Sequence, residues 1–433
     1  MQPAKKSIEE EEEETHCNAM AVMIRALYCT AGAGMEELLA EEVQHKLCAT
    51  QVEQIPGRVF FCSNADLQTV TQLKSAERLF ILLSKAEPLS LPNNPGVNEQ
   101  EFTVLIAAVV KQRVVGDPDV WRQTFLTWTA LQQELQCSQQ RGQKRKREDE
   151  EESLHTPSFR VSCRCSGVIA RSYTSQVNVY LSDDHCIVGI PLLKHPLSSR
   201  SYMKHNGLRS TIAWAMSSLC PKKLNDCVIL DPMCGVGAVL LEAAQEYSNA
   251  VFLGMDTDLS QLQKAAENVK ASGMEGRVQL LQSSAMEIPL ADGAVDAVLC
   301  DVPFGRKFSC SSDMPTALPR LLREMERVLR VGGHLVLLLS LQLSAQLKKT
   351  ICTHKHNQNV NSLDTNNLHT DPSNTHNEST DTPKPLMFHK SSSEMSNSPL
   401  LISSLQAQRT HKVSLGSTDA FIHTYTKIKT QTL

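Results

Sequence analysis

The chain has 433 residues, which is enough for two or three domains with sizeable hydrophobic cores. It carries 43 Lys and Arg against 47 Asp and Glu, but eleven of these acids lie in two runs at residues 9–14 and 148–152, leaving 36 elsewhere. Because acidic runs are usually solvated tails, the small net charge of -4 does not exclude a nucleic acid partner.

The composition also bears on the cellular compartment. The chain has 14 cysteines without paired CxxC motifs, which predicts reduced thiols in an intracellular protein, with no zinc ribbon and no metal site. The amino terminus is polar and acidic, so we expect no signal peptide. The longest apolar run, residues 104–110, is too short to cross a bilayer, and no membrane partner is predicted.

The first 90 residues alternate between strand and helix patterns. Residues 1–19 read as a disordered acidic tail, followed by a strand at 21–29, a helix at 35–47, a strand at 58–62 and a helical span over 65–82. Strand, helix, strand and helix in this short space predict a ferredoxin-like module over residues 20–90.

The next segment, residues 91–195, has a charged linker at 140–157 inside it. Residues 101–137 are predicted to be helical, with an aromatic set as core rather than a base-stacking surface: Trp121, Phe125 and Trp128. Residues 144–147 are a basic cluster, which favours the nucleus, with the cytoplasm as the alternative. Residues 158–193 alternate as strands do, and basic side chains gather from here to residue 209. A solvated sheet face and an RNA-facing surface explain these charges equally well: Arg160, Arg164, Arg171, Lys194, Arg200, Lys204 and Arg209.

A glycine-rich turn opens the third part of the chain. The apolar run 227–230 reads as a buried strand, and residues 238–244 read as a helix. Between them lie Asp231, Pro232, Gly235 and Gly237, in the pattern Asp-Pro-x-x-Gly-x-Gly. The glycines permit a tight turn near a ligand, and the acid would repel a dinucleotide pyrophosphate. A cationic ligand such as S-adenosylmethionine suits the turn better.

Two further strands end in acids. Asp256 ends the strand 250–255, 25 positions after Asp231, where a carboxylate can accept both hydroxyls of a ribose. The strand 294–300 ends in Asp301-Val302-Pro303-Phe304-Gly305, which resembles the Asp/Asn-Pro-Pro-Phe/Tyr signature of methyltransferases that act on exocyclic amines. Asp301 and the Val302 carbonyl would accept the two N–H groups of the amine, and Phe304 would stack on the base.

The rest of the chain completes an α/β pattern. A helix at 318–329 precedes a strand at 334–339, and two strands at 412–416 and 420–425 are expected to form a closing hairpin at the sheet edge. Residues 350–400 are rich in Asn, Ser, Thr and His without periodicity, so we expect a disordered insertion. The predicted fold class is α/β, with a parallel, doubly wound, Rossmann-like sheet over residues 196–433.

Several short motifs occur in one order, namely residues 29–32, 159–161, 207–209, 231–235 and 301–305. With these motifs the chain resembles the THUMP-domain RNA methyltransferases, specifically over 196–340 and moderately over 20–85 and 158–195. The resemblance implies a ferredoxin-like module, a THUMP domain and a class I methyltransferase domain. It also implies methylation of the 2-amino group of guanosine, in U6 small nuclear RNA for one branch of the family and in tRNA for others. A small zinc-binding activator subunit is the implied protein partner, in a heterodimer.

The resemblance implies roles for particular residues. The catalytic set is Asp301, Pro303 and Phe304, and S-adenosylmethionine would lie against Asp231, Pro232, Gly235, Gly237, Asp256, Ala285 and Met286. The RNA contacts would be Arg160, Arg171, Arg200, Arg209, Arg306 and Lys307. Two departures stand out: the span between Arg171 and Val177 is short for a THUMP helix and strand, and Ser284 stands where many relatives have an acid.

Two alternatives stay open. The short span after Arg171 is what a catalytically inactive RNA-binding scaffold would tolerate, whereas the three intact acids oppose that interpretation. The Asp-Pro-Phe chemistry would also serve a methyltransferase for a protein glutamine or a DNA adenine, which the amino-terminal modules disfavour. An NAD oxidoreductase fits least, because Asp231 occupies the approach of the pyrophosphate.

Overall fold

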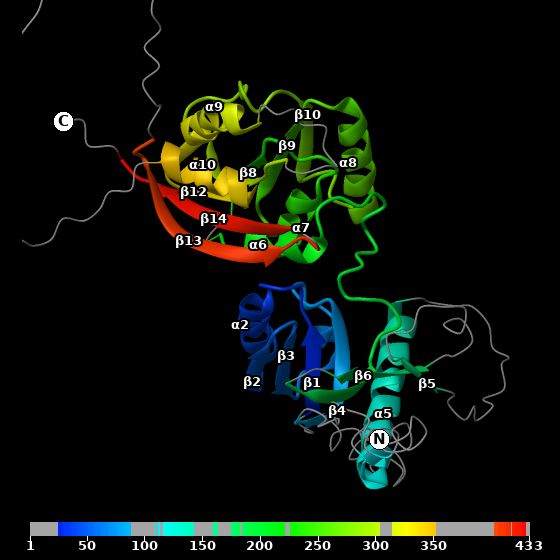
Figure 1. Ribbon diagram of the computed structural model, residues 1–433. Coiled ribbons are helices and arrows are strands. Elements are labelled where there is room, and N and C mark those ends of the chain that lie inside the picture. Colours follow the sequence, from blue (N-terminus) through cyan, green and yellow to red (C-terminus); the bar gives the residue numbers. More distant parts are fainter. Residues whose placement is uncertain are drawn as a thin grey trace, which may run out of the picture.

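The computed structural model describes residues 25–87, 108, 111–112, 116–142, 159–162, 175–181, 184–220, 226–303, 314–351, 402–416 and 418–429. These residues form two units, each built on a seven-stranded sheet, which lie one below the other in Figure 1. The expected tail at 1–19 lies outside the described residues, as do most of the charged linker predicted at 140–157 and most of the insertion predicted at about 350–400. Residues 140–142 end one helix and residue 350 ends another.

The amino-terminal sheet has the strand order β2-β3-β1-β4-β7-β6-β5. Its neighbours are antiparallel, apart from the parallel pair β5 and β6. The strands are β1 (Arg25–Thr30), β2 (Thr50–Ile55), β3 (Arg58–Ser63), β4 (Arg78–Ala86), β5 (Phe159–Ser162), β6 (Ser175–Leu181) and β7 (Cys186–Pro191). Its helices are α2 (Glu36–Leu47), α3 (Leu67–Val70) and α5 (Pro118–Gly142).

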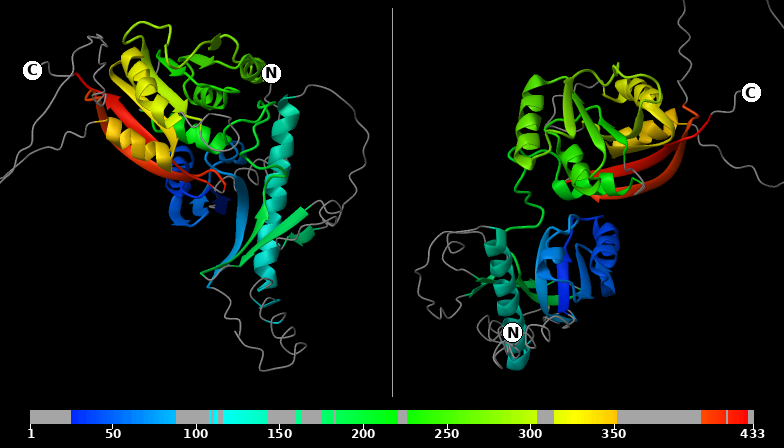
Figure 2. Two further views of the ribbon diagram at one scale, coloured as in Figure 1. Left: turned by 45° about the horizontal axis from the view of Figure 1, so that its top comes forward. Right: turned by 180° about the vertical axis from the view of Figure 1, so that it is seen from behind.

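The elements of this region follow the order β1-α2-β2-β3-α3-β4, which is compatible with the ferredoxin-like module predicted over residues 20–90. The assignment of that module stays a prediction. Strand β4 pairs with β7, so strands from both sides of residue 90 share one sheet. The long helix α5 runs along this sheet, as two further views show (Figure 2). The domain boundaries and the THUMP assignment remain predictions.

The helical span predicted over residues 65–82 is wrong. Helix α3 covers only Leu67–Val70, capped by the Asp66 side chain, and the apolar run after it is strand β4. Strand β4 is central in its sheet and buries Leu79, Phe80 and Ile81 in succession. A strand buried on both faces shows no alternation, so its pattern cannot be distinguished from that of a buried helix. Strand β2 was not predicted at all, because it is largely exposed.

The carboxyl-terminal sheet confirms the doubly wound, Rossmann-like prediction. Its order is β10-β9-β8-β11-β12-β14-β13, with the first five strands parallel and a closing antiparallel hairpin beside β12. The strands are β8 (Val228–Asp231), β9 (Val251–Asp256), β10 (Val278–Gln282), β11 (Val295–Asp301), β12 (Leu329–Ser340), β13 (Leu405–Ser414) and β14 (Asp419–Lys427).

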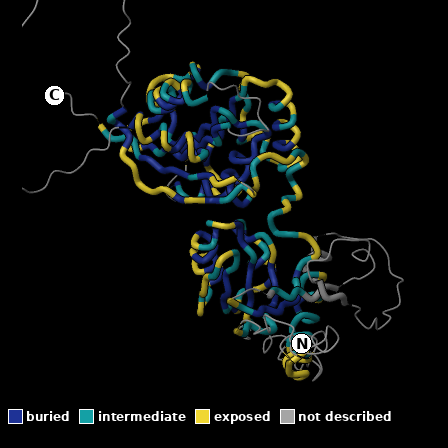
Figure 3. The backbone as a smooth tube through the Cα atoms, viewed as in Figure 1, coloured by how far each residue is buried: buried dark blue, intermediate teal, exposed yellow. Residues whose placement is uncertain are grey.

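Helices cover both faces of this sheet. They are α6 (Ser210–Ser218), α7 (Ala238–Glu246), α8 (Leu259–Ser272), α9 (Met314–Val328) and α10 (Leu341–Thr350). Successive residues of β12 enter opposite cores: Leu338 packs with α6, α7 and α8, and Leu337 packs with α9 and α10. Both cores are fully buried, and Figure 3 shows them as the dark centre of the upper unit.

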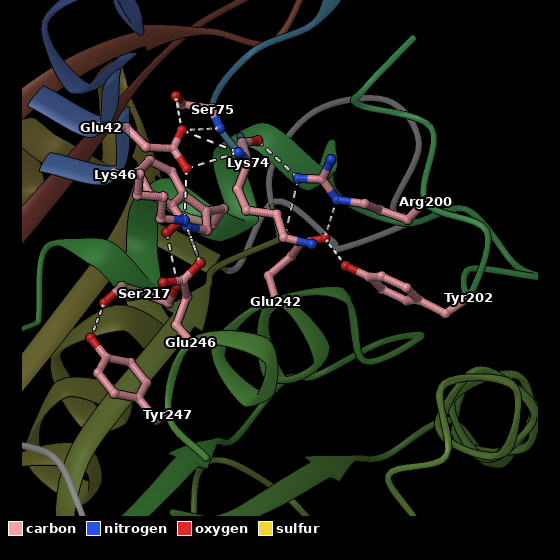
Figure 4. Close-up of polar contacts among 11 residues, drawn as sticks. Glu42, Lys46, Lys74, Ser75, Arg200, Tyr202, Ser217, Glu242, Glu246 and Tyr247 are labelled. Atoms are coloured by element: carbon pink, nitrogen blue, oxygen red, sulfur yellow. Dashed lines mark hydrogen bonds and ion pairs between the residues drawn. The ribbon is translucent and has the colours of Figure 1, made fainter. Parts of the chain in front are cut away.

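Polar contacts join the two units (Figure 4). Glu42 of α2 is buried and accepts hydrogen bonds from the backbone N–H groups of Lys74 and Ser75. Lys46 Nζ lies 2.9 Å from Glu42 Oε1 and 3.1 Å from Glu246 Oε1 of α7, so it bridges the units. The hairpin contributes a further contact, because His411 Nε2 lies 2.5 Å from the Gly34 carbonyl oxygen.

Candidate cofactor and catalytic site

Three carboxylates meet at one edge of the carboxyl-terminal sheet. Asp231, Asp256 and Asp301 are the last residues of β8, β9 and β11, and β8 lies between the other two strands. All three line one cavity of about 850 Å³. Ligands of open parallel sheets bind at this position, beyond the carboxyl ends of the strands.

Asp231 is the most buried of the three acids. It is 1% exposed, and its Oδ1 accepts a 3.2 Å hydrogen bond from the Met233 N–H. Burial raises the pKa of Asp231 well above its ordinary value, and the charges of Asp301 and Asp256 raise it further. A cation placed here would relieve that repulsion, whereas an anion would add to it. The site therefore fits a positively charged ligand.

The glycine turn has the conformation that its sequence predicts. Gly235 and Gly237 have φ values of +52° and +82°, in the left-handed region that favours glycine. The Gly235 N–H donates a 2.9 Å hydrogen bond to Asp256 Oδ2, while Asp256 Oδ1 accepts from Asp258 N–H at 2.8 Å. Each oxygen of Asp256 keeps a lone pair for a ligand hydroxyl. Pro232 also lines the cavity.

Ser284, Ala285 and Met286 form another wall of the same cavity. Ala285 is 6% exposed, and the Ser284 hydroxyl accepts a 3.2 Å hydrogen bond from the Met286 N–H. The serine at the position of an acid in many relatives therefore holds its own loop. The adenine contact assigned to Ala285 and Met286 stays a prediction that this placement permits.

Asp301 and Pro303 line the cavity at the end of β11. Burial raises the pKa of Asp301 to about 7. Val302 is fully buried, and its N–H donates to the Leu338 carbonyl of β12 at 3.2 Å, which anchors the motif to the sheet. Phe304, Arg306 and Lys307 lie outside the described residues.

A segment that sequence analysis did not assign to the site, the strap at residues 204–208, also lines the cavity. Residues 204–208 lead from the amino-terminal unit into α6 and line the cavity together with α8. The fully buried Asn268 of α8 holds this strap: its Oδ1 accepts from His205 N–H at 2.9 Å, and its Nδ2 donates to the carbonyls of His205 and Val236 at 3.0 Å. A polar residue among the buried side chains of α8 was the available signal.

The predicted RNA contacts have different fates. Arg200 is a poor candidate, because its side chain is 4% exposed and its Nε lies 2.8 Å from the buried Glu242 of α7. Arg209 is 40% exposed and pairs with Glu77 at 3.2 Å. Arg160 lies on β5, and Arg171 lies outside the described residues. The ion pair with Glu242 therefore gives Arg200 a structural role within the protein, and RNA binding is not needed to explain its charge.

The cysteines near the site are structural in character. Cys234 and Cys300 are buried, and burial raises the pKa of both thiols, so neither is a ready nucleophile. Within the described part of the chain, no three His, Cys, Asp or Glu side chains are grouped closely enough to hold a metal ion. None of the described helices has the length and apolarity needed to cross a membrane.

Solved structures share this fold. TrmN from Thermus thermophilus is 17% identical, with a TM-score of 0.56 over 93% of this chain and 99% of its own. SMU.472, a putative methyltransferase complexed with SAH, is 13% identical, with a TM-score of 0.53 over 94% of this chain and 99% of its own. At such identities the likeness concerns the fold alone.

Sequence relatives are closer. A family model described as the RMKL-like methyltransferase domain matches residues 198–369. The U6 snRNA (guanine-N(2))-methyltransferase THUMPD2 of Homo sapiens is 34% identical, over 92% of this chain and 95% of that protein. Its Bos taurus counterpart is 36% identical, over 72% and 78%. The tRNA (guanine(6)-N(2))-methyltransferase THUMP3 of Bos taurus is 35% identical, over 39% and 36%. The chain therefore belongs to the THUMPD2 family, within the THUMP-domain RNA methyltransferases.

Proposed function

We propose that this protein transfers a methyl group from S-adenosylmethionine to the 2-amino group of a guanosine in U6 small nuclear RNA. The observation that carries the proposal is the row of acids Asp231, Asp256 and Asp301 at adjoining strand ends, with Asp301 opening an Asp-Val-Pro motif. U6 RNA is favoured over tRNA because THUMPD2 relatives match up to 92% of the chain, and the THUMP3 relative 39%.

Different residues of the cavity would contact different parts of the cofactor. Asp231 would face the methionine ammonium, Asp256 would accept the ribose hydroxyls, and Ala285 with Met286 would flank the adenine. The Gly235 and Gly237 turn leaves the backbone close to the ligand, since no Cβ stands there. When bound, S-adenosylmethionine supplies an electrophilic methyl group on its sulfonium.

Asp301 would act on the acceptor amine. Its carboxylate and the Val302 carbonyl accept the two N–H groups, which directs the nitrogen lone pair toward the methyl carbon. A nitrogen–carbon bond forms as the carbon–sulfur bond breaks, and the bonding pair stays on sulfur. The nitrogen then carries a positive charge, and one of its protons passes to the Asp301 carboxylate, whose pKa near 7 suits that step. Phe304 is the stacking face in this proposal.

The partner and compartment form a finer part of the proposal. We infer a heterodimer with a small zinc-binding activator subunit, and residence in the nucleus, where U6 small nuclear RNA would be the substrate. The family resemblance supports both inferences, and the basic cluster at residues 144–147 adds to the second.

Methyl transfer from labelled S-adenosylmethionine to total small RNA tests the proposal. The reaction is run with and without the activator subunit, and with Asp301→Ala as the control. We expect label in the U6 band as 2-methylguanosine, and its loss in the variant. Measurable cofactor binding without label in any RNA, even with the activator present, would contradict the proposal and favour the inactive scaffold or a protein substrate.

A further inference from the structure

Residues 192–209 join β7 of the amino-terminal unit to α6 of the carboxyl-terminal unit, and we call this segment the interunit linker. Two more hollows lie beside this linker. The nearer, of about 550 Å³, shares Asn206, Gly207 and Leu208 with the cofactor cavity. The farther, of about 650 Å³, shares Pro196, Ser199 and Arg200 with the nearer one. The three spaces therefore follow one another along the linker, from the catalytic cavity toward helix α5, whose Gln132 and Gln136 line the far end.

The two hollows are basic, although the chain as a whole is acidic. Five Lys or Arg residues line them against a single carboxylate, Glu77: Lys74, Arg78, Lys194, Arg200 and Arg209. Glu77 is paired with Arg209 at 3.2 Å. Arg78 and Lys194 are exposed, and no described carboxylate forms an ion pair with either. An excess of free cations beside an RNA-modifying cavity indicates a site for phosphates.

The floor between the two hollows is rigid. Arg200, which both hollows share, donates from Nη2 to the Lys74 carbonyl at 2.8 Å and from Nε to Glu242 at 2.8 Å. Tyr202 donates to the same carboxylate at 2.5 Å. These bonds join the linker to both units, as Figure 4 shows, so the hollows are held in place before any ligand arrives.

The occupant follows from the reaction. A base that is methylated on its exocyclic amine must leave its stack and enter the cavity, and the energetic cost of this step is least where the target nucleotide already lies in a single strand. We propose that the two hollows form a track for the single RNA strand flanking the target guanosine, with Arg78 and Arg209 at the nearer phosphate and Lys194 at the farther one. This inference rests on the proposed function. It assigns the phosphate contacts to exposed side chains, because Arg200 is buried and cannot contact RNA.

Binding of U6 small nuclear RNA to the full chain with its activator tests the track. The double variant Arg78→Ala/Lys194→Ala is compared with wild type over a series of salt concentrations. The matched control is Lys349→Ala, an exposed lysine of α10 that lines neither hollow. Each lost single-strand phosphate contact lowers the slope of log affinity against log salt by roughly 0.7. We expect a slope smaller by about 1.4, an affinity reduced on the order of tenfold, and unchanged affinity for S-adenosylmethionine.

The conservative pair Arg78→Lys/Lys194→Arg should restore the slope, because it restores both charges. A double alanine variant that matches the Lys349→Ala control in slope and affinity would overturn the track. Because binding is the readout, the two proposals can fail separately. If wild type binds U6 RNA through Arg78 and Lys194 but methylates nothing, only the proposed function fails. If wild type methylates U6 RNA and the double variant binds it normally, only the track fails.

Discussion

The two seven-stranded sheets of this protein differ in what their edges offer. In the carboxyl-terminal sheet, five parallel strands bring their carboxyl ends to one edge, where Asp231, Asp256 and Asp301 gather around a cavity. In the largely antiparallel amino-terminal sheet, most neighbouring strands end at opposite edges. The acids that line a cavity beside this unit, Glu41, Glu42 and Glu246, come from helices α2 and α7 and not from strand ends. The parallel order of the strands therefore brings the three acids together at one cavity.

The largest difference expected between substitutions in the two units is in the affinity for S-adenosylmethionine. Asp231→Asn keeps the shape and removes the charge, so it should weaken S-adenosylmethionine binding about 10- to 100-fold, equivalent to roughly 1.5–3 kcal/mol. Calorimetric titration measures this change. Arg78→Ala, in the amino-terminal unit, is the control and should leave cofactor affinity unaltered. Equal affinities for Asp231→Asn and wild type would mean that the buried acid does not hold the cofactor.

The pH dependence of kcat/KM should arise from a residue of the carboxyl-terminal unit. The pKa of Asp301 is about 7, and the ionised form accepts the amine, so kcat/KM should rise with pH and level off above 7. Below pH 7, kcat/KM should fall about tenfold for each decrease of one pH unit. In Asp301→Asn the rise should disappear, because an amide does not titrate. A pH profile of Asp301→Asn that parallels wild type would assign the titration to another group.

The same carboxyl has a consequence for stability. Because its pKa is raised by folding from 3.8 to about 7, the folded state binds its proton more tightly than the unfolded state, and stability is lost as the pH rises between these two values. Asp301→Asn should therefore unfold at a higher temperature than wild type at pH 8, and the difference should shrink as the pH falls toward 5. Thermal unfolding followed by circular dichroism measures this, and a constant difference across that range would contradict it.

The smallest predicted effect concerns the strap. Asn268→Ala removes three hydrogen bonds from a buried site, so it should lower the free energy of unfolding by about 1–3 kcal/mol and raise the KM for the cofactor several-fold. Asn249→Ala, at an exposed position, is the matched control. A stability loss without any change in KM would show that Asn268 supports the fold and not the strap over the cofactor.

Prediction from sequence succeeded where local pattern and topology agree. The acids at strand ends and the positive-φ glycines were predictable because a parallel sheet places strand ends together whatever the loops do. Strand β4 was mistaken for helix because burial on both faces removes its alternation. The strap at 204–208 and the pairing of Arg200 with Glu242 depend on contacts 42 or more residues apart, and no local pattern reports those.

The most direct test of the proposed reaction removes the acceptor amine from the RNA. Once the labelled guanosine of U6 RNA is mapped, a synthetic RNA with inosine at that position lacks only the 2-amino group. We predict that wild-type protein with its activator binds both RNAs with similar affinity, methylates the guanosine RNA and leaves the inosine RNA unmethylated. Methyl transfer to the inosine RNA at the same nucleotide would contradict the assignment of Asp301 to an exocyclic amine.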